Sequence, residues 1–291
     1  MKRSAWPVVL LVCGLPALAG CAAEAWKMKQ ITAVGQLAVP ECCLVDAQTG
    51  KVYVSNMDTD SGAYWADDGK GSIALLAPGG TPIDMRWQVS TEEVPLHSPK
   101  GMALHNRVLY VADNGRVLGF PLTAARGVKP FKGPQGEHLN DMATDGDAVY
   151  VSDTAAGVVY RMAKEGVTRV KAPAGVNGIT FFKEKMYAVS WDLHEVYELD
   201  PTGAADPVPM GLADHFVTPD GIEVLDDGTI LVSDMHANRV AAIAPDRKHV
   251  YTLVELDTPA DIGLDRDRML LYVPQFERDC VTVCRLMPQE Q

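Results

Sequence analysis

The chain has 291 residues, of which 47% are hydrophobic and 22% are charged, and its formal net charge is −12. This composition excludes global disorder and allows one sizeable core. A strongly acidic protein repels phosphate backbones, so we expect no nucleic-acid partner. The 25 Gly and 19 Pro residues suit an architecture of short strands and many turns.

Residues 1–20 are typical of an export signal. Lys2 and Arg3 precede the apolar run from Ala5 to Ala17, which is short for a membrane span and fits the hydrophobic region of a secretory signal. The run then ends in Leu18-Ala19-Gly20-Cys21. An ordinary signal peptide followed by a chance cysteine is the alternative interpretation.

The Leu-Ala-Gly-Cys run resembles the lipobox of bacterial lipoproteins. This resemblance implies cleavage before Cys21 and attachment of lipid to its sulfur, so Cys21 is the predicted lipidation site and membrane anchor. Ala22 stands where Asp would retain the protein in the inner membrane. The expectation is therefore an exported, lipid-anchored protein on the outer membrane, facing the periplasm.

Four further cysteines belong to the mature chain. Cys42 and Cys43 lie near its start, and Cys280 and Cys284 lie near its end. An oxidising periplasm permits disulfides, so bridges that staple the two ends are one interpretation. Four buried thiols are the other, because pairing cannot be deduced from spacing.

A unit of about 40 residues, the length of a four-stranded propeller blade, recurs from residue 40 to the end. Its strongest strand is a β-branched and aromatic run bounded by turn residues. The six copies are Val52-Tyr53-Val54, Leu109-Tyr110-Val111, Val149-Tyr150-Val151, Met186-Tyr187-Ala188, Ile230-Leu231-Val232 and Leu271-Tyr272-Val273.

These repeats predict an all-β protein with a six-bladed β-propeller over residues 31–291, after a tether at residues 21–30. Residues 31–39 are expected to add a strand to the last blade, which removes an exposed sheet edge. The first interval is longer than the others because residues 56–71 form an insertion. Long loops in compact domains are often functional, and this one carries Tyr64 and Trp65.

One polar residue near the start of each first strand is expected to line one mouth of the central channel. Alignment of the repeats selects Glu41, Lys100, Asn140, Asn177, Asp220 and Asp261. Three carboxylates and one ammonium leave an excess of negative charge that a divalent cation would neutralise. Oxygen donors suit a hard ion such as Ca²⁺.

The ring resembles the SMP-30/gluconolactonase/LRE-like family. Glu41, Asn140-Asp141, Asn177-Gly178 and Pro219-Asp220-Gly221 carry this resemblance, which covers residues 38–287. It implies one divalent metal, Ca²⁺ first and Mg²⁺, Mn²⁺ or Zn²⁺ otherwise. Its ligands would be Glu41, Asn177 and Asp220.

The same resemblance implies hydrolysis of a small-molecule lactone or ester. Asp220 would double as general base, and Asn140 would hold a water or a substrate hydroxyl. Lys100 is a candidate third catalytic residue that steadies an oxyanion. The alternative for Lys100 is a structural ion pair with Glu41 or Asp261.

Loops between the second and third strands should open on the same face. They bring Trp191, His194, His236 and Phe276 to the mouth as candidate pocket residues, and the imidazoles, with that of His138, are candidate acid–base groups.

Two features depart from the family pattern. Cys42 and Cys43 replace the usual Gly-Pro after Glu41, and Pro99-Lys100-Gly101 and Ala260-Asp261-Ile262 are similar to NHL-type repeats. Both weaken the case for catalysis more than the case for metal binding. The competing hypothesis is therefore a non-enzymatic ligand- or protein-binding propeller, with a structural metal or none.

Overall fold

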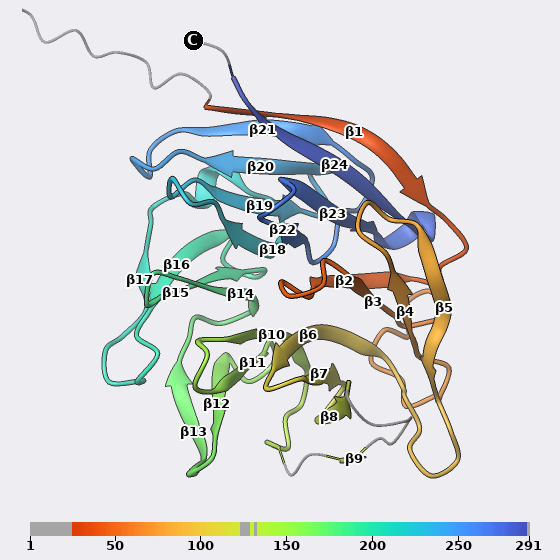
Figure 1. Cartoon of the computed structure of the whole chain (residues 1–291). Helices are drawn as coiled ribbons and strands as arrows, with labels where there is room; N and C mark the ends of the chain where they lie inside the picture. The colour runs from red at the N-terminus through yellow and green to blue at the C-terminus, as the bar shows by residue number, and fades with distance from the viewer. Residues whose placement is uncertain (1–24, 123–128, 131–132, 290–291) are drawn as a thin grey trace, which may run out of the picture.

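Six four-stranded sheets form a ring, which confirms the predicted six-bladed β-propeller (Figure 1). The computed structural model describes residues 25–122, 129–130 and 133–289. Residues 1–20 and Cys21, the predicted signal and lipidation site, lie outside this part of the chain. Among the described residues, no helix is long and apolar enough to cross a membrane.

The first three blades follow each other along the chain. Blade one contains β2 (Pro40–Val45), β3 (Val52–Asn56), β4 (Ser72–Leu76) and β5 (Pro82–Val89). Blade two contains β6 (Pro99–His105), β7 (Val108–Asp113), β8 (Arg116–Pro121) and β9 (Lys129–Pro130). Blade three contains β10 (Leu139–Thr144), β11 (Val149–Asp153), β12 (Val158–Ala163) and β13 (Gly166–Lys171).

The last three blades complete the ring. Blade four contains β14 (Val176–Phe182), β15 (Lys185–Ser190), β16 (Glu195–Leu199) and β17 (Val208–Pro209). Blade five contains β18 (Pro219–Val224), β19 (Ile230–Asp234), β20 (Arg239–Ile243) and β21 (Val250–Glu255). Blade six contains β22 (Gly263–Asp265), β23 (Leu270–Gln275), β24 (Cys280–Pro288) and β1 (Trp26–Val34). Two short 3₁₀ turns, Ala213–His215 and Phe276–Arg278, follow β17 and β23.

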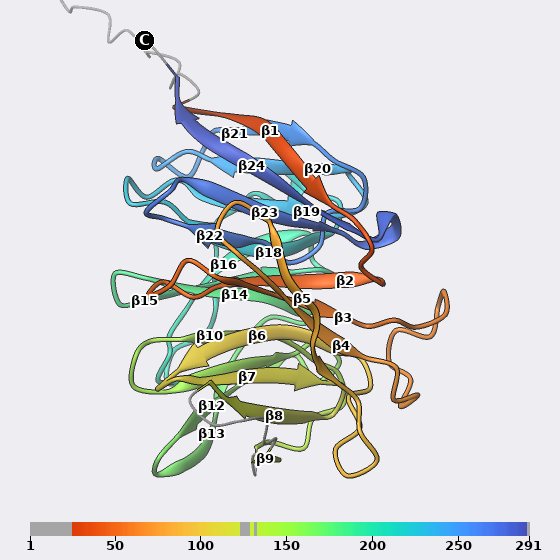
Figure 2. The same ribbon diagram turned by 45° about the vertical axis from the view of Figure 1, so that its right-hand side comes forward.

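The N-terminal strand closes the ring. β1 pairs antiparallel with β24 from Trp26 opposite Pro288 to Val34 opposite Val281, and the two strands run side by side in both views (Figures 1 and 2). Blade six therefore joins the two ends of the described chain and leaves no open seam. The strand begins at Trp26, inside the segment expected to be a tether, because Trp26 and Met28 pack against the core of blades five and six.

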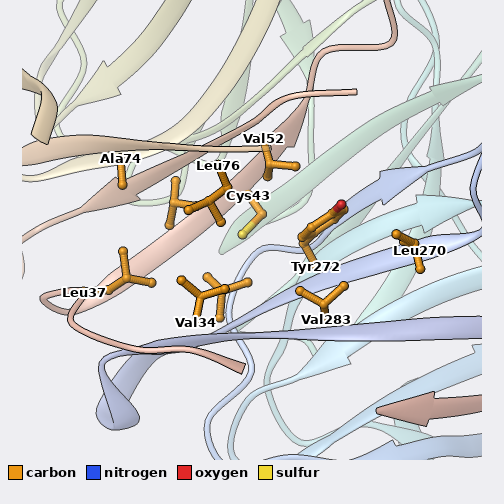
Figure 3. Packing of buried hydrophobic residues seen from close by; sticks show 11 residues of the cluster. Val34, Leu37, Cys43, Val52, Ala74, Leu76, Leu270, Tyr272 and Val283 are labelled. Atoms are coloured by element: carbon orange, nitrogen blue, oxygen red, sulfur yellow. The ribbon is translucent and has the colours of Figure 1, made fainter. Parts of the chain in front are cut away.

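Apolar side chains fill the space between neighbouring blades, with one core cluster at each blade-to-blade junction. Figure 3 shows the junction of blades six and one, where Tyr272 and Val283 face Val52 and Leu76. The middle strands are buried on both faces, and β11 and β19 each begin with three apolar residues in succession. The outer strand β13 instead buries only Val170.

The cysteines are free thiols within the described residues. Cys42, Cys43 and Cys284 are buried, and Cys280 is partly buried. Cys43 packs at the junction of blades six and one, and Cys284 packs at the junction of blades five and six. The structure thus favours the buried-thiol interpretation over the stapling disulfides.

Candidate functional site

An irregularity recurs where each first strand begins. Pro40 pairs with Asn56 but Cys43 pairs with Val54, so two residues of β2 lie opposite one residue of β3. The same one-residue shift occurs in the first strands of blades two to five, and in blade six it falls between Pro259 and Gly263. A β-bulge breaks the alternation of side chains, so two successive residues of each strand can face the channel.

Serine hydroxyls from the second strands stabilise three of these bulges. Ser55 Oγ accepts the Cys42 N–H at 2.9 Å. Ser152 Oγ accepts the Asp141 N–H at 2.9 Å, and Ser233 Oγ accepts the Gly221 N–H at 2.7 Å. These contacts satisfy amides that the shifted ladder leaves without a strand partner.

Aspartates at the ends of the second strands hold the loops that enter the channel. Asp113 Oδ1 accepts the amides of His97 and Ser98 at 2.9 and 2.8 Å. Asp153 and Asp234 do the same for the loops that precede blades three and five.

The first bulge residue of each blade forms a layer at the mouth of the channel. This first layer consists of Glu41, Lys100, Asn140, Asn177 and Asp220, with Ala260 at the matching position of blade six. All five polar members are buried and line one cavity of about 480 Å³, called here the mouth cavity. The sequence placed these five residues together correctly.

Asp261 does not belong to the first layer. It lies at the level of Cys42, to which it is joined by a parallel bridge, one position further along the strand. The alignment matched Asp261 to the other acids by residue type, whereas the strand register puts Ala260 there. The formal charge of the first layer is therefore −1, from Glu41, Asp220 and Lys100.

Asp141, Asp261 and Cys42 form a second layer below the first. One potential ligand atom of each lies within 4.8 Å of the others, and all three residues are buried. Burial raises the pKa of Asp141 to about 7. Burial, and after it the negative charge of Asp141, raise the pKa of Asp261 well above its usual value. Sequence analysis missed this cluster, although acids directly follow Asn140 and Ala260.

Glycines make the second layer compact. A Cβ on Gly101 would lie 2.3 Å from the Asp141 Cα, and one on Gly221 would lie 2.6 Å from an Asp261 carboxylate oxygen. A second, larger cavity of about 580 Å³ begins at this layer and opens at the other end of the channel. We place the candidate site in the mouth cavity because buried polar atoms without partners lie there.

Two polar atoms of the first layer have no hydrogen-bond partner. They are Glu41 Oε2 and Asn140 Oδ1, on side chains that are 6% and 7% exposed. Asn140 Nδ2 is anchored on Thr154 Oγ1 at 3.2 Å, which leaves its oxygen directed elsewhere. A buried acceptor without a donor is costly, so this layer is suited to an additional cation or donor.

The two first-layer carboxyl groups resist ionisation. Burial, and after it the charge of Asp220, raise the pKa of Glu41 well above its usual value. Burial raises the pKa of Asp220 to about 7, although Asn177 Nδ2 donates to Asp220 Oδ1 at 2.5 Å and opposes this rise. A divalent cation bound between these oxygens would favour their charged forms.

Lys100 holds the blade-one insertion, which covers residues 57–71 rather than 56–71 because β3 ends at Asn56. It makes no ion pair with Glu41 or Asp261. Its Nζ donates to the Tyr64 carbonyl at 2.7 Å, to the carbonyl and hydroxyl of Ser98 at 3.1 Å each, and to Asn114 Oδ1 at 3.3 Å. It also lies 3.8 Å from the ring centroid of Trp65. Burial lowers the pKa of Lys100 to about 8.

Aromatic side chains surround the first layer. Trp191, His236 and Phe276 line the mouth cavity as predicted, together with Tyr64, Trp65 and His138. His194 does not line it, because its Nδ1 approaches the Val217 carbonyl from an exposed turn. The residue is exposed and has φ 58°, in the left-handed region.

Known proteins share the fold of this chain at low sequence identity. No family model and no curated protein matches the sequence. Virginiamycin B lyase from Staphylococcus aureus is 14% identical with a TM-score of 0.60, over 90% of this chain and 100% of that chain. A protein described as a candidate gluconolactonase is 16% identical with a TM-score of 0.64, over 92% and 95%. Luciferin-regenerating enzyme is 14% identical with a TM-score of 0.62, over 90% and 95%.

These similarities establish the architecture. At such identities they support the six-bladed propeller fold alone, because one fold hosts many functions. The chain is a six-bladed β-propeller similar in structure to gluconolactonase-like and luciferin-regenerating proteins.

Proposed function

We propose that this protein is a divalent-metal-dependent hydrolase of small lactones or esters. The observation that carries the proposal is the pair of buried acceptors without partners, Glu41 Oε2 and Asn140 Oδ1, at the base of an open cavity. The structural similarity to a candidate gluconolactonase agrees with this chemistry.

Glu41, Asn177 and Asp220 would hold the cation. Their donors are carboxylate and amide oxygens, which favour Ca²⁺, while Mg²⁺ and Mn²⁺ accept the same atoms and Zn²⁺ prefers nitrogen or sulfur. When bound, such an ion polarises a substrate carbonyl and lowers the pKa of a water molecule. The ion would also offset the negative charge of the layer and engage Glu41 Oε2.

Asp220 is the proposed general base. Its carboxyl group is buried on the floor of the mouth cavity, and a bound cation would keep it ionised and so able to accept a proton. Asp220 takes the proton from water as the oxygen attacks the ester carbon, and the ring or ester C–O bond then breaks. The proton passes to the leaving alkoxide, so the product is a hydroxy acid, or an acid and an alcohol.

Asn140 and Lys100 support this reaction in different ways. Asn140 Oδ1 accepts a hydrogen bond from the attacking water or a substrate hydroxyl, while its amide nitrogen stays on Thr154. Lys100 has three protons and four acceptors within hydrogen-bond distance. The proposal therefore assigns it the positioning of the insertion rather than the stabilisation of an oxyanion.

The proposed setting is the periplasmic face of the outer membrane, with Cys21 as the lipid anchor. The support for this setting is the signal and lipobox pattern of residues 1–21. Metabolic labelling with a fatty acid, compared between the full chain and Cys21→Ser, tests the anchor. Incorporation that persists in the variant contradicts it.

A chelated and reconstituted mature protein provides the test of function. A panel of lactones and esters is assayed by acid release with Ca²⁺, Mg²⁺, Mn²⁺ or Zn²⁺, in wild type and in Asp220→Asn, which preserves the size of the side chain. We expect metal-dependent turnover that falls at least a hundredfold in the variant. If no substrate is hydrolysed with any metal, the binding-propeller hypothesis replaces the hydrolase.

A further inference from the structure

The mouth cavity has three levels of different chemistry. Its floor consists of the buried first layer, flanked by the apolar side chains of Met57 and Met235. Its rim is exposed and polar, with Asp192, His236 and Glu277. Between them is the aromatic wall, which consists of half-buried Tyr64, Trp65, His138, Trp191 and Phe276.

The aromatic wall has a continuous arc on one side of the cavity. Tyr64 packs edge-on against Phe276 with ring centroids 4.9 Å apart. Its neighbour Trp65 stacks on His138 at 4.1 Å with an interplanar angle of 13°. This arc joins blade six, the blade-one insertion and the loop that enters blade three.

Trp191 stands on the other side. It follows β15 of blade four, and its ring meets His236 of blade five at 5.3 Å in an edge-on arrangement. In a ring of six blades, blades four and five lie opposite blades one and two. A ligand that reaches the floor therefore passes between two aromatic surfaces.

The arc is fixed before any ligand enters. Besides the contacts of Lys100, Asn114 Nδ2 donates to the carbonyls of Trp65 and Ala66 and to Asp67 Oδ1, at 3.2, 3.1 and 2.8 Å. Ser98 Oγ donates to the Tyr64 carbonyl at 2.8 Å. A wall that is already ordered loses little conformational freedom when a ligand binds.

Two threonine hydroxyls near the wall already have hydrogen-bond partners. Thr154 donates to the Val176 carbonyl at 2.8 Å and accepts from Asn140, and Thr258 Oγ1 accepts the Glu277 amide at 3.1 Å. The faces of the aromatic rings form no conventional hydrogen bonds, so a polyhydroxylated ligand lying between them would lose the hydration of its hydroxyl groups, which is unfavourable.

We propose that the mouth cavity selects substrates that carry a flat apolar ring, such as aryl-fused lactones or aryl esters, over polyhydroxylated sugar lactones. The ring lies between Trp191 and the arc of Tyr64, Trp65 and Phe276, while the ester group reaches the floor. Burial of the ring against aromatic surfaces supplies the selectivity. Hydrolysis of such a ligand rests on the proposed function, whereas its binding between the aromatic surfaces does not.

Two measurements separate the ligand class from the reaction. The first is kcat/KM for isochromanone, an aryl-fused lactone, and for gluconolactone in the Ca²⁺-loaded protein. The second is calorimetric binding of the isoquinolinone lactam that corresponds to isochromanone, which resists hydrolysis. Both are repeated in Trp191→Ala and in Trp191→Phe, which restores a ring, and in Trp65→Ala in case the first variant is poorly folded.

We expect isochromanone to be preferred by at least tenfold, and lactam affinity to fall about tenfold in Trp191→Ala and recover in Trp191→Phe. Ca²⁺-dependent hydrolysis that favours gluconolactone would overturn the ligand class and leave the hydrolase intact. Selective lactam binding without hydrolysis of either lactone would support the ligand class and reject the hydrolase. If lactam binding is unchanged in both alanine variants, the proposal that the aromatic wall binds the ring of the ligand is wrong.

Discussion

Asn177 Nδ2 donates to Asp220 Oδ1 at 2.5 Å across the junction of blades four and five. Both side chains start from the first bulge residue of their strands, β14 and β18. The contact therefore depends on the channel geometry of two blades rather than on either blade alone. It places an amide and a carboxylate where the proposed cation would bind.

Replacement of the Asn177 amide by a carboxylate should lower the stability of the chelated protein and increase the stabilisation that Ca²⁺ gives. In Asn177→Asp, two carboxyl groups lie in contact, so the chelated protein should unfold at a lower temperature than wild type. Added Ca²⁺ should then raise the midpoint more than in wild type, because the site has one more charged ligand. Thermal scans with and without chelator measure both effects.

The exposed variant Asn106→Asp provides the control for a general effect of charge. A chelated midpoint that is equal in Asn177→Asp and wild type would show that the two residues do not meet in the folded protein.

The buried carboxyl groups predict an unusual dependence of stability on pH. Burial raises the pKa values of Asp141 and Asp220 to about 7, and those of Glu41 and Asp261 also lie well above their usual values. In the window between the ordinary carboxyl pKa and about 7, the folded state binds more protons than the unfolded state. The free energy of unfolding of the metal-free protein therefore falls as pH rises through this window.

Thermal scans of the chelated protein at about pH 5 and about pH 8 test this sign, and the lower pH should give the higher midpoint. Ca²⁺ should reduce the difference, because a cation favours the ionised carboxylates. A midpoint that rises with pH in the chelated protein contradicts the assignment of raised pKa values to the channel.

Lys100 should control the order of the blade-one insertion. In Lys100→Met the Tyr64 and Ser98 carbonyls and Asn114 Oδ1 lose a charged donor, so residues 57–71 should be less tightly held. Amide hydrogen exchange in this segment should accelerate at least tenfold while the strands keep their protection. Lys70→Met, which removes exposed ion pairs of the same loop, should have little effect.

If the amides of residues 57–71 exchanged at the wild-type rate in both lysine variants, the role of Lys100 in holding the insertion would be rejected. Faster exchange throughout all blades would instead show that Lys100 stabilises the whole ring.

The bulge serines should matter for stability although they are small. Ser233→Ala leaves the Gly221 amide without its acceptor, which costs about 1–3 kcal/mol for a buried group. At about 2–4 °C per kcal/mol for a domain of this size, the unfolding midpoint should fall by several degrees. The exposed replacement Ser61→Ala should leave the midpoint unchanged, and an equal effect of both variants would contradict this role.

The blades themselves were predictable from sequence because each contains a buried middle strand with a continuous apolar run. The start of β1 at Trp26 was missed because the alternation of burial covers only Trp26 to Lys29, and the strand then stays exposed as far as Ala33. This segment is a strand because it pairs with β24 along its whole length.

The site was predictable only as far as one residue per blade. Each bulge shifts the strand register by one residue, and no residue type in the sequence indicates where a bulge occurs. Asp261 was therefore placed in the first layer, and its cluster with Asp141 and Cys42 was missed. The partners of Lys100 were also missed, because the path of the insertion depends on tertiary contacts with Ser98 and Asn114.

The most direct test is thermal unfolding of the protein after chelation and after stepwise addition of Ca²⁺, in wild type and in Asp220→Asn. Binding to the folded state at about 100 times Kd adds about 2.7 kcal/mol, so the wild-type midpoint should rise by several degrees in a concentration-dependent way. The variant should show a much smaller rise. The absence of a shift with Ca²⁺, Mg²⁺, Mn²⁺ and Zn²⁺, or an equal shift in both proteins, would contradict a metal site in the first layer.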